Sequence, residues 1–451
     1  MNQNVLSIGA ASVAAILVVA LIFVPGLGLS GSSTTQETTK STSVPLTDNN
    51  HHSALDGLNL QLPASFMQIT PQQAFALSGH VVHMNLVAFE KTITLPTGAS
   101  GGDGGNLASH VIAYTFNGTI PGPVIRATQG DVIIATITDP ATNTDTHSID
   151  NHASVISALN FVAPASAPAV QTYYFVATQP GAWEYHCEGH VNDLAEHAFR
   201  GMHGIVIVDP ANGYQGYKLT TTVGNTTRNH PVSADAKEVA LDFGEYYLTQ
   251  NADATKDGDF DWTAMYNHDV TYATINGIPY GYQPLALNPT TGNLPTVTGA
   301  TPLQFNQGDH VRFFVLNSGD YPVNFHIVGE ILDQVTQGGV VQQGVQTFMI
   351  GAANTAIIDV TFQQPGAFVI VNHDYSQLFK GQVAVVLVSP QGTSVSNPSN
   401  AVPPMGMDSI AQTTTPYTFG TPFNHWNGTS TLPCYEQPYS KALSPCFDTT
   451  N

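Results

Sequence analysis

The sequence predicts an all-β protein with two tandem Greek-key domains, each a β-sandwich or barrel, behind an apolar N-terminal segment. It holds 40 Gly and 29 Pro among short runs of Val, Ile and Thr, and no long apolar pattern of period 3.6. Three landmarks also recur at separations of 178, 185 and 180 residues: Gly130-Asp131 as Gly308-Asp309, Gln179-Pro180-Gly181 as Gln364-Pro365-Gly366, and Gly201 as Gly381. Such a constant offset indicates two copies of one domain.

The chain begins with an apolar stretch, residues 5–29, that carries no charged side chain. About 20 apolar residues suffice to cross a bilayer as a helix. Secretory segments are shorter, about 7–15 residues, and follow a basic region, which residues 1–4 lack. An uncleaved membrane anchor is therefore favoured over a cleaved signal, and either one exports the remainder of the chain.

The remaining boundaries follow from composition and from the repeat. We expect an anchor or signal segment at 1–30, a Ser/Thr-rich linker at 31–59, a first domain at 60–210, a linker at 211–234, a second domain at 235–390 and an extended tail at 391–451. The tail contains Cys434 and Cys446, which we expect to form a disulfide in an exported protein. The alternative, two unpaired thiols, requires a reducing compartment.

The charge balance is strongly acidic, because 11 Lys and Arg stand against 32 Asp and Glu for a net charge of −21. Only 10% of the residues are charged, against roughly 25% in ordinary soluble proteins. Without a basic surface to neutralise phosphates, a nucleic-acid partner is excluded. The acidity suits an exported protein or a docking face for a basic redox partner.

The most informative motif is Cys187, the only cysteine in the first 430 residues, followed by His197 and Met202. A thiolate, two imidazoles and a thioether are the ligands of a blue, electron-transferring copper site. His147 is well placed to supply the second imidazole from an earlier strand. His190 is a rival for His197, which we prefer because its five-residue gap to Met202 is typical of blue-copper loops.

A second metal is indicated by His186, which directly precedes Cys187. Neighbouring residues of a strand point to opposite faces, so His186 is free to bind another copper. In the second copy of the repeat, Asn372 and Gln382 stand where the first copy has Cys187 and Met202. That copy keeps His326 and His373, and His326 lies 17 residues after Asp309, much as His147 lies 16 after Asp131.

These residues carry a resemblance to copper-containing nitrite reductases, two-domain cupredoxin enzymes that assemble as homotrimers. The matching motifs are Phe116-Asn117-Gly118-Thr119-Ile120-Pro121, His147-Ser148-Ile149-Asp150-Asn151-His152, Tyr185-His186-Cys187, Gly201-Met202, Phe325-His326-Ile327-Val328-Gly329 and Val371-Asn372-His373. The similarity covers roughly residues 85–390. With the apolar N-terminus it suggests an archaeal, membrane-anchored type in the wider multicopper oxidase superfamily.

The resemblance implies two coppers per chain and a role for each matching residue. Type 1 copper is expected on His147, Cys187, His197 and Met202, and type 2 copper on His152, His186 and His373, the last from the adjacent subunit. Asp150 and His326 are expected to handle protons, and Val328 to shape the substrate pocket. The implied partners are nitrite and a small donor protein, a cupredoxin or cytochrome, outside the cytoplasm.

Two other functions and a calcium site are alternative hypotheses for this sequence. A laccase-like two-domain oxidase needs His-x-His pairs, of which the chain has none, and Glu188 follows Cys187. A plain electron-transfer cupredoxin explains Cys187 and Met202 but leaves the other histidines without a role. Residues 257–261 form an acidic turn that could hold calcium, although a solvated turn is favoured. The polar, acidic loop 188–196 departs from the resembled family and could alter partner choice or redox potential.

Overall fold

Four β-sheets dominate the computed structural model, which describes residues 81–96, 108–153, 169–189, 193–210, 213–214, 217–223, 226–232, 236–250, 257–284 and 297–393. The mainly β prediction is confirmed, with only three short helices in these residues: α2 (Leu194–Phe199), α3 (Trp262–Tyr266) and α4 (Tyr375–Leu378). The segment 5–29, the tail and His190 lie outside the described residues. Within them, no helix is long and apolar enough to cross a membrane.

The first half of the described chain, residues 81–210, forms two sheets. Their strands are β1 (Val81–Thr94), β2 (His110–Phe116), β3 (Ile125–Thr128), β4 (Val132–Asp139), β5 (Asp150–Asn151), β6 (Ala169–Val176), β7 (Gly181–His186) and β8 (His203–Asp209). One sheet has the order β2-β1-β4-β6 and the other β3-β8-β7-β5. Between them lies an apolar core that includes Leu86, Ile133, Tyr185 and Val206.

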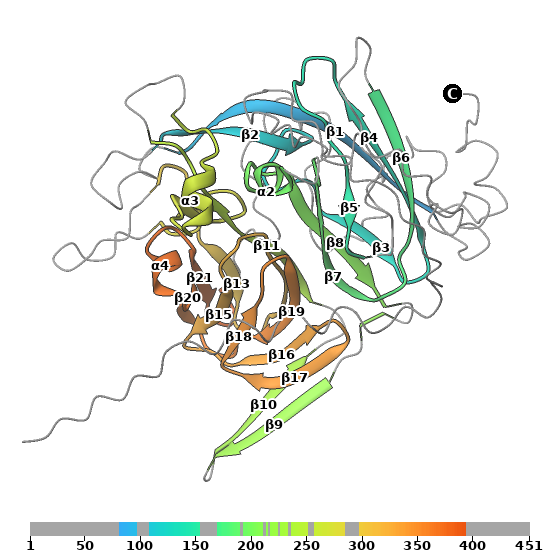
Figure 1. Ribbon diagram of the computed structural model, residues 1–451. Coiled ribbons are helices and arrows are strands. Elements are labelled where there is room, and N and C mark those ends of the chain that lie inside the picture. Colours follow the sequence, from blue (N-terminus) through green and yellow to red (C-terminus); the bar gives the residue numbers. More distant parts are fainter. Residues whose placement is uncertain are drawn as a thin grey trace, which may run out of the picture. The chain divides into compact units, whose positions relative to one another are not determined.

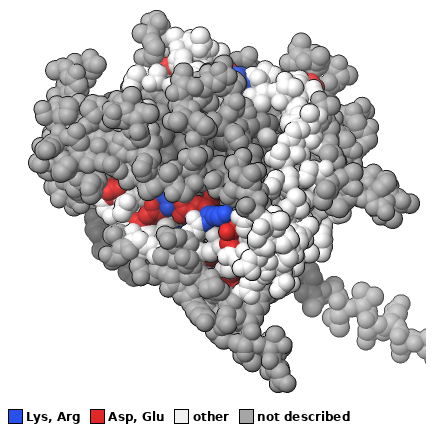
Figure 2. Space-filling model, turned by 180° about the vertical axis from the view of Figure 1, so that it is seen from behind, with Lys and Arg blue, Asp and Glu red and all other residues white. Residues whose placement is uncertain are grey.

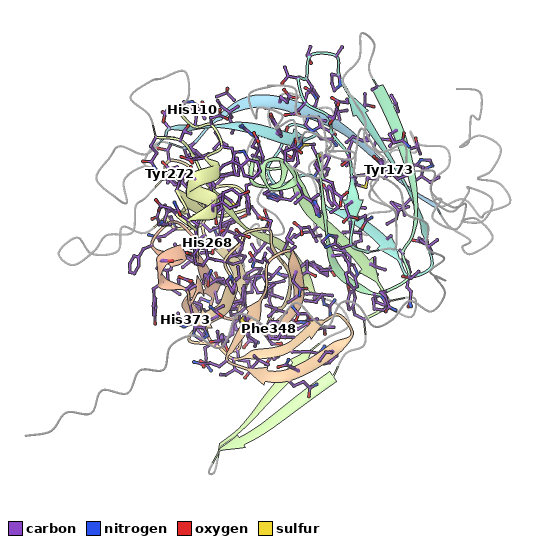
Figure 3. The ribbon with its side chains drawn as sticks, in the orientation of Figure 1. His110, Tyr173, His268, Tyr272, Phe348 and His373 are labelled. Carbon is purple, nitrogen blue, oxygen red and sulfur yellow. The ribbon has the colours of Figure 1, made fainter. Side chains whose placement is uncertain are left out.

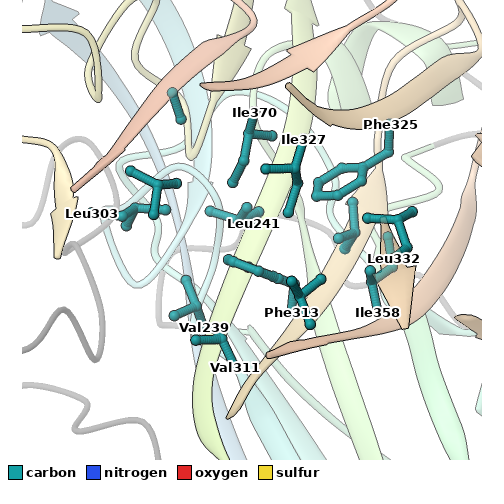
Figure 4. Close-up of a cluster of buried hydrophobic side chains, with 14 of the residues drawn as sticks. Val239, Leu241, Leu303, Val311, Phe313, Phe325, Ile327, Leu332, Ile358 and Ile370 are labelled. Atoms are coloured by element: carbon teal, nitrogen blue, oxygen red, sulfur yellow. The ribbon is translucent and has the colours of Figure 1, made fainter. Parts of the chain in front are cut away.

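The second half, residues 236–393, has the same two-sheet arrangement with more strands in each sheet (Figure 1). Its strands are β11 (Lys237–Tyr246), β12 (Tyr272–Ile275), β13 (Leu303–Asn306), β14 (His310–Asn317), β15 (Val323–Val328), β16 (Leu332–Gln337), β17 (Val340–Val345), β18 (Thr347–Ile350), β19 (Asn354–Thr361), β20 (Gly366–Asn372) and β21 (Val383–Ser389). The sheet orders are β12-β11-β14-β19-β16-β17 and β13-β21-β20-β15-β18. Figure 4 shows their shared core, with Phe313, Phe325 and Ile358 between the sheets.

Strand pairing repeats between the halves in register and direction. β1 runs parallel to β4 as β11 does to β14, and β3 runs parallel to β8 as β13 does to β21. The Asn-Gly turns repeat too: Asn117 and Asn276 both have positive φ, each followed by a glycine with positive φ. Asn-Gly is favoured in a two-residue turn of this kind, because both central residues need a positive φ.

A hairpin of β9 (Tyr217–Val223) and β10 (Thr226–Val232) occupies the region expected to be a plain linker, and Figure 1 shows it projecting from the sheets. Three consecutive threonines, Thr220–Thr222, precede Gly224-Asn225, a hairpin-turn sequence between β-branched runs. The sequence therefore contained the signal for this hairpin.

The two halves belong to one compact unit and share a buried interface. Ile205 and Ile207 of β8 pack against Phe314 and Leu316 of β14. At its edge, the Arg126 guanidinium bridges Asp209 of the first half and Glu238 of the second. Figure 2 shows a short band of charged side chains, mostly acidic, among the described residues of the rear face. Through this interface β7, which carries His186 and leads to Cys187, contacts β14 and β19 of the second half.

Candidate metal centre

Three predicted ligands converge in the first half. Cys187 follows the last residue of β7, His147 precedes β5, and His197 lies on α2. The Cys187 Sγ lies 3.4 Å from Nδ1 of His197 and 3.8 Å from Nδ1 of His147. All three side chains are fully buried, as is Met202. Residues close together in the sequence and His147, which lies 40 positions before Cys187, thus meet in one buried pocket.

Backbone amides hold the sulfur in place. The N–H groups of Ser148 and Gly189 both point at Sγ of Cys187, each at 3.2 Å. The peptide of Met202 closes the loop, because its carbonyl accepts from the Cys187 N–H and its own N–H donates to the His197 carbonyl. N–H donors directed at a sulfur favour a thiolate, the form in which cysteine binds metals.

Glycine is required at position 189, where φ is +52°. A Cβ at this position would lie 2.5 Å from an Asp193 oxygen and 2.7 Å from the His197 ring. The missing side chain therefore allows the loop to pass directly over the histidine. This donor set, two imidazole nitrogens and a thiolate beside a buried thioether, fits type 1 copper.

Acidic side chains that belong to no predicted motif surround the imidazoles. Oε1 of Glu90 lies 3.3 Å from Nε2 of His147. On the other imidazole, Nε2 of His197 faces Oδ2 of Asp145 at 3.9 Å and Oδ1 of Asp193 at 3.8 Å. Asp193 precedes His197 by four residues, a helical spacing that could have revealed this pair.

A second cluster contains Asp150, His152 and His186. Nε2 of His152 lies 3.1 Å from Nε2 of His186, and Oδ2 of Asp150 lies 3.3 Å and 3.7 Å from these two nitrogens. Asp150 pairs with His186 across β5 and β7, so strand register brings them together. Nδ1 of His186 contacts its neighbour's carbonyl, that of Cys187, at 3.1 Å, which leaves Nε2 for a metal.

Electrostatics keep Asp150 ionised in this cluster. Burial alone would raise the pKa of its carboxyl, but the His152 hydrogen bond and the nearby His186 outweigh burial and lower it. A carboxylate that stays charged beside two imidazoles can accept a proton. The three groups together have the donor chemistry of a catalytic metal site with an adjacent base.

His326, Val328 and His373 lie in the second half and do not join that cluster. The His326 and His373 rings stack with centroids 4.9 Å apart, and Nδ1 of His326 contacts the Gln346 carbonyl at 2.7 Å. Val328, at the end of β15, is 48% exposed. Figure 3 places His373 beside β15 and α4. Among the described residues, no group of three close ligands includes either histidine.

The expected position of His326 in the repeat was wrong. Cys187 corresponds to Asn372, because their amides donate to the Met202 and Gln382 carbonyls in turn. The preceding residue pairs with Asp150 in the first half and with His326 in the second. His326 therefore corresponds to Asp150 and not to His147. The second copy is two residues shorter here, since Asp150 lies 19 residues after Asp131 and His326 lies 17 after Asp309, and this difference conceals the register in the sequence.

The acidic turn 257–261 has a structural role in the described chain. The Asp259 carboxylate binds Arg200, and Asp261 caps α3 by accepting from the Thr263 and Ala264 amides. No group of three candidate metal ligands was found there among the described residues. His203, which no metal motif claimed, is buried with Nε2 2.9 Å from Asp242 Oδ2 across the interface of the two halves.

Known proteins resemble this chain in sequence and fold. Residues 105–213 match the family model described as multicopper oxidase. A copper-containing nitrite reductase of Neisseria meningitidis serogroup B is 26% identical over 302 residues, covering 66% of each chain. One from Neisseria gonorrhoeae is 27% identical over 270 residues, covering 59% of this chain and 60% of its own length. The chain thus spans somewhat under two thirds of these relatives.

Solved structures agree with the fold. A copper nitrite reductase from Nitrosomonas europaea has a TM-score of 0.54 and 26% identity, and the match covers 71% of this chain and 96% of that one. A copper-containing nitrite reductase from Thermus scotoductus has a TM-score of 0.53 at 18% identity, which shows likeness of fold alone. The chain thus has the two-domain cupredoxin fold and resembles copper-containing nitrite reductases.

Proposed function

We propose that this protein is a copper-containing nitrite reductase that converts nitrite to nitric oxide. One observation carries the proposal: two clusters of different chemistry are joined by the single peptide bond between His186 and Cys187. Bound copper would supply one-electron transfer at each cluster and an open position for nitrite at the second. The reaction consumes one electron and two protons per nitrite and yields nitric oxide and water.

The chain's own residues handle the electron path and the first proton. Cys187 and His186 point to opposite faces of one strand end, so a covalent path links the two clusters. Asp150, ionised and beside both imidazoles of the second cluster, is the group that accepts a proton and gives it to a nitrite oxygen. His326 supplies the second proton from the second half of another subunit.

The third ligand of the second cluster is His373 of a neighbouring copy in a homotrimer. The repeat supports this arrangement, because His326 occupies in the second half the position that Asp150 occupies in the first. Packing the first half of one copy against the second half of the next would set these equivalent edges face to face. Such head-to-tail contacts close into a ring when the rotation fits. Val328, half exposed in one chain, would then line the nitrite pocket.

The proposed cellular location rests on the composition of the N-terminal segment. We propose that residues 1–30 anchor or export the protein, that the domains span 60–210 and 235–390, and that 391–451 form a tail. Nitrite then meets the enzyme outside the cytoplasm, and a small cupredoxin or cytochrome donates electrons. An oxygen-reducing oxidase is less supported, because the residue after Cys187 is Glu188 and the chain has no His-x-His pair.

Substitution of His373 by Ala in the copper-loaded protein tests the proposal. We expect the type 2 EPR signal and nitrite turnover to disappear while the blue absorption of the first cluster survives. His268, more than half exposed and outside both clusters, is the matched control, and His268→Ala should keep both signals. Nitrite turnover that persists in the His373→Ala variant would refute the shared centre, and four coppers per chain would indicate an oxidase.

A further inference from the structure

The carboxylates around the first cluster form a second layer that the proposed function does not explain. Glu90 faces the outer nitrogen of one imidazole, and Asp145 and Asp193 face the outer nitrogen of the other. The inner nitrogens of both rings point to Cys187. Each of the two imidazoles thus lies between the thiolate and a carboxylate.

These carboxylates are oriented by the fold. Glu90 accepts from the Thr144 amide at 2.8 Å and the Asp145 amide at 2.7 Å, which ties β1 to the loop before His147. Oδ2 of Asp145 accepts the Tyr114 hydroxyl at 3.0 Å, and the Tyr114 ring packs edge-on against His197 at 5.0 Å. Three separate parts of the chain therefore hold this layer.

Asp193 has an unusual position. It is the N-cap residue of α2, yet its side chain makes no capping hydrogen bond, whereas Asp261 and Asp374 do cap their helices. Its carboxylate instead turns toward His197, in the space left by the missing Cβ of Gly189. The helix gives up a cap, which is typically worth ~1 kcal/mol, to place a charge beside the imidazole.

Burial makes these charges effective. The side chains of His147 and His197 are 0% exposed, that of Asp193 4% and that of Asp145 11%. Water and salt therefore screen the carboxylates poorly. Arg200, which lies over the Tyr114 ring, is itself bound to Glu196 and Asp259.

We propose that Asp145 and Asp193, together with Glu90, are positioning residues that orient the two imidazoles and lower the reduction potential of the type 1 centre. A carboxylate on the outer nitrogen of a metal-bound histidine fixes the ring and raises its basicity. Negative charge also stabilises the oxidised metal, which carries one positive charge more than the reduced one. The centre becomes a stronger reductant toward the second cluster and requires a donor of low potential.

The inference rests on the proposed copper site and is tested by a redox titration of the blue absorption in the copper-loaded full chain. Asp193→Asn and Asp145→Asn keep the side-chain shape and remove the charge. We expect each to favour reduction about tenfold, which is ~59 mV for a one-electron couple. Asp269→Asn is the matched control, because its carboxylate in the second half is 82% exposed, and it should not change the potential.

A charge-retaining variant separates electrostatics from folding. Asp193→Glu should keep the potential near that of the unchanged protein, and Asp145→Asn carries the test if Asp193→Asn does not fold. Potentials unchanged in both Asn variants would overturn the inference. It would also be overturned by a metal count above two per chain that falls in Asp193→Asn, because the carboxylates would then be ligands of another cation.

The same titration distinguishes this inference from the proposed function. A wild-type protein with no blue absorption when loaded with copper would refute both. Blue absorption with the expected shifts, but without nitrite turnover, would refute the proposed reaction and leave the role of the carboxylates standing.

Discussion

The two halves of the molecule contain the same pocket with different chemistry. In the first, Sγ of Cys187 accepts N–H groups from Ser148 and from the residue two positions after the cysteine, both at 3.2 Å. In the second, Oδ1 of Asn372 accepts from Asn324 and from the residue two positions after the asparagine, both at 2.9 Å. The fold supplies the donors, and the side chain decides whether they hold a sulfur or an amide.

The rest of the second pocket is completed without a metal. Gln382 stands where Met202 does, and its Oε1 accepts from Asn372 Nδ2 at 2.8 Å. The Gln382 N–H donates to the Gln377 carbonyl at 3.1 Å, as that of Met202 donates to His197. Three amide side chains therefore stand where the first half has a thiolate, a thioether and an imidazole.

A carboxylate beneath each pocket responds to this difference. Glu90 and Glu245 occupy equivalent positions of β1 and β11, and both accept backbone amides of the loop that follows the parallel neighbouring strand, β4 or β14. Burial would raise the pKa of Glu90, but hydrogen bonds from His147 and the loop lower it. For Glu245 burial prevails and raises the pKa to about 7, although its hydrogen bonds oppose this. The pKa values of the two carboxyls are thus shifted in opposite directions, and the hydrogen bond from the His147 imidazole contributes to this difference.

The largest effect is expected from making the first pocket resemble the second. Cys187→Asn removes the thiolate, so the blue absorption and the type 1 EPR signal should be lost, and nitrite turnover should fall at least a thousandfold as electron entry stops. The second cluster should still bind its copper, as measured by the type 2 signal. Blue absorption in this variant would mean that Cys187 is not the thiolate ligand of the copper.

Removing the amide from the second pocket should destabilise the fold. Asn372→Ala leaves two backbone N–H groups and the Gln382 amide without this partner in a buried site, so the free energy of unfolding should fall by about 3 kcal/mol. Urea denaturation measures the change. Gln343→Ala, on the exposed strand β17, is the control and should change stability by less than about 0.5 kcal/mol. If both variants lowered the free energy of unfolding equally, the proposal that the buried amide network stabilises the fold would be contradicted.

The buried carboxyl of Glu245 predicts a pH dependence for the second half. The folded protein keeps this proton up to about pH 7, whereas the unfolded chain loses it near 4.5, so the folded state binds more protons in this range. The free energy of unfolding should therefore fall by about 3 kcal/mol as pH rises from 4.5 to above 7. Denaturation of the protein and of Glu245→Gln at pH 5 and pH 8 should reveal a smaller fall in the variant.

The smallest effect is expected from exchanging only the axial position. Met202→Gln introduces the side chain that the second half carries at Gln382. Blue-copper sites accept glutamine as a weak axial ligand, so copper should stay bound with a changed potential. A redox titration should give a shift of the order of tenfold in the reduction equilibrium. Complete loss of the blue absorption would indicate that the pocket cannot accommodate an amide beside a thiolate.

The sequence alone determined the β class, the repeat and the identity of the candidate ligands. These signals are local: strand composition, Asn-Gly turns, and the short loop from His186 to Met202 that keeps a cysteine, a histidine and a methionine together. Contacts inside one loop can be predicted without knowing how the remaining chain folds. The similarity to known nitrite reductases agrees with what these motifs predicted.

The tertiary structure alone decided which side chains surround those ligands. Glu90 reaches His147 across 57 residues only because β1 pairs in parallel with β4, which leads into the loop before His147, in one register. His326 proved equivalent to Asp150, which a residue count did not reveal, because the copies differ in loop length while their strand pairing agrees. Strand register is set by packing between distant segments, and a shift of one residue would reverse every side chain.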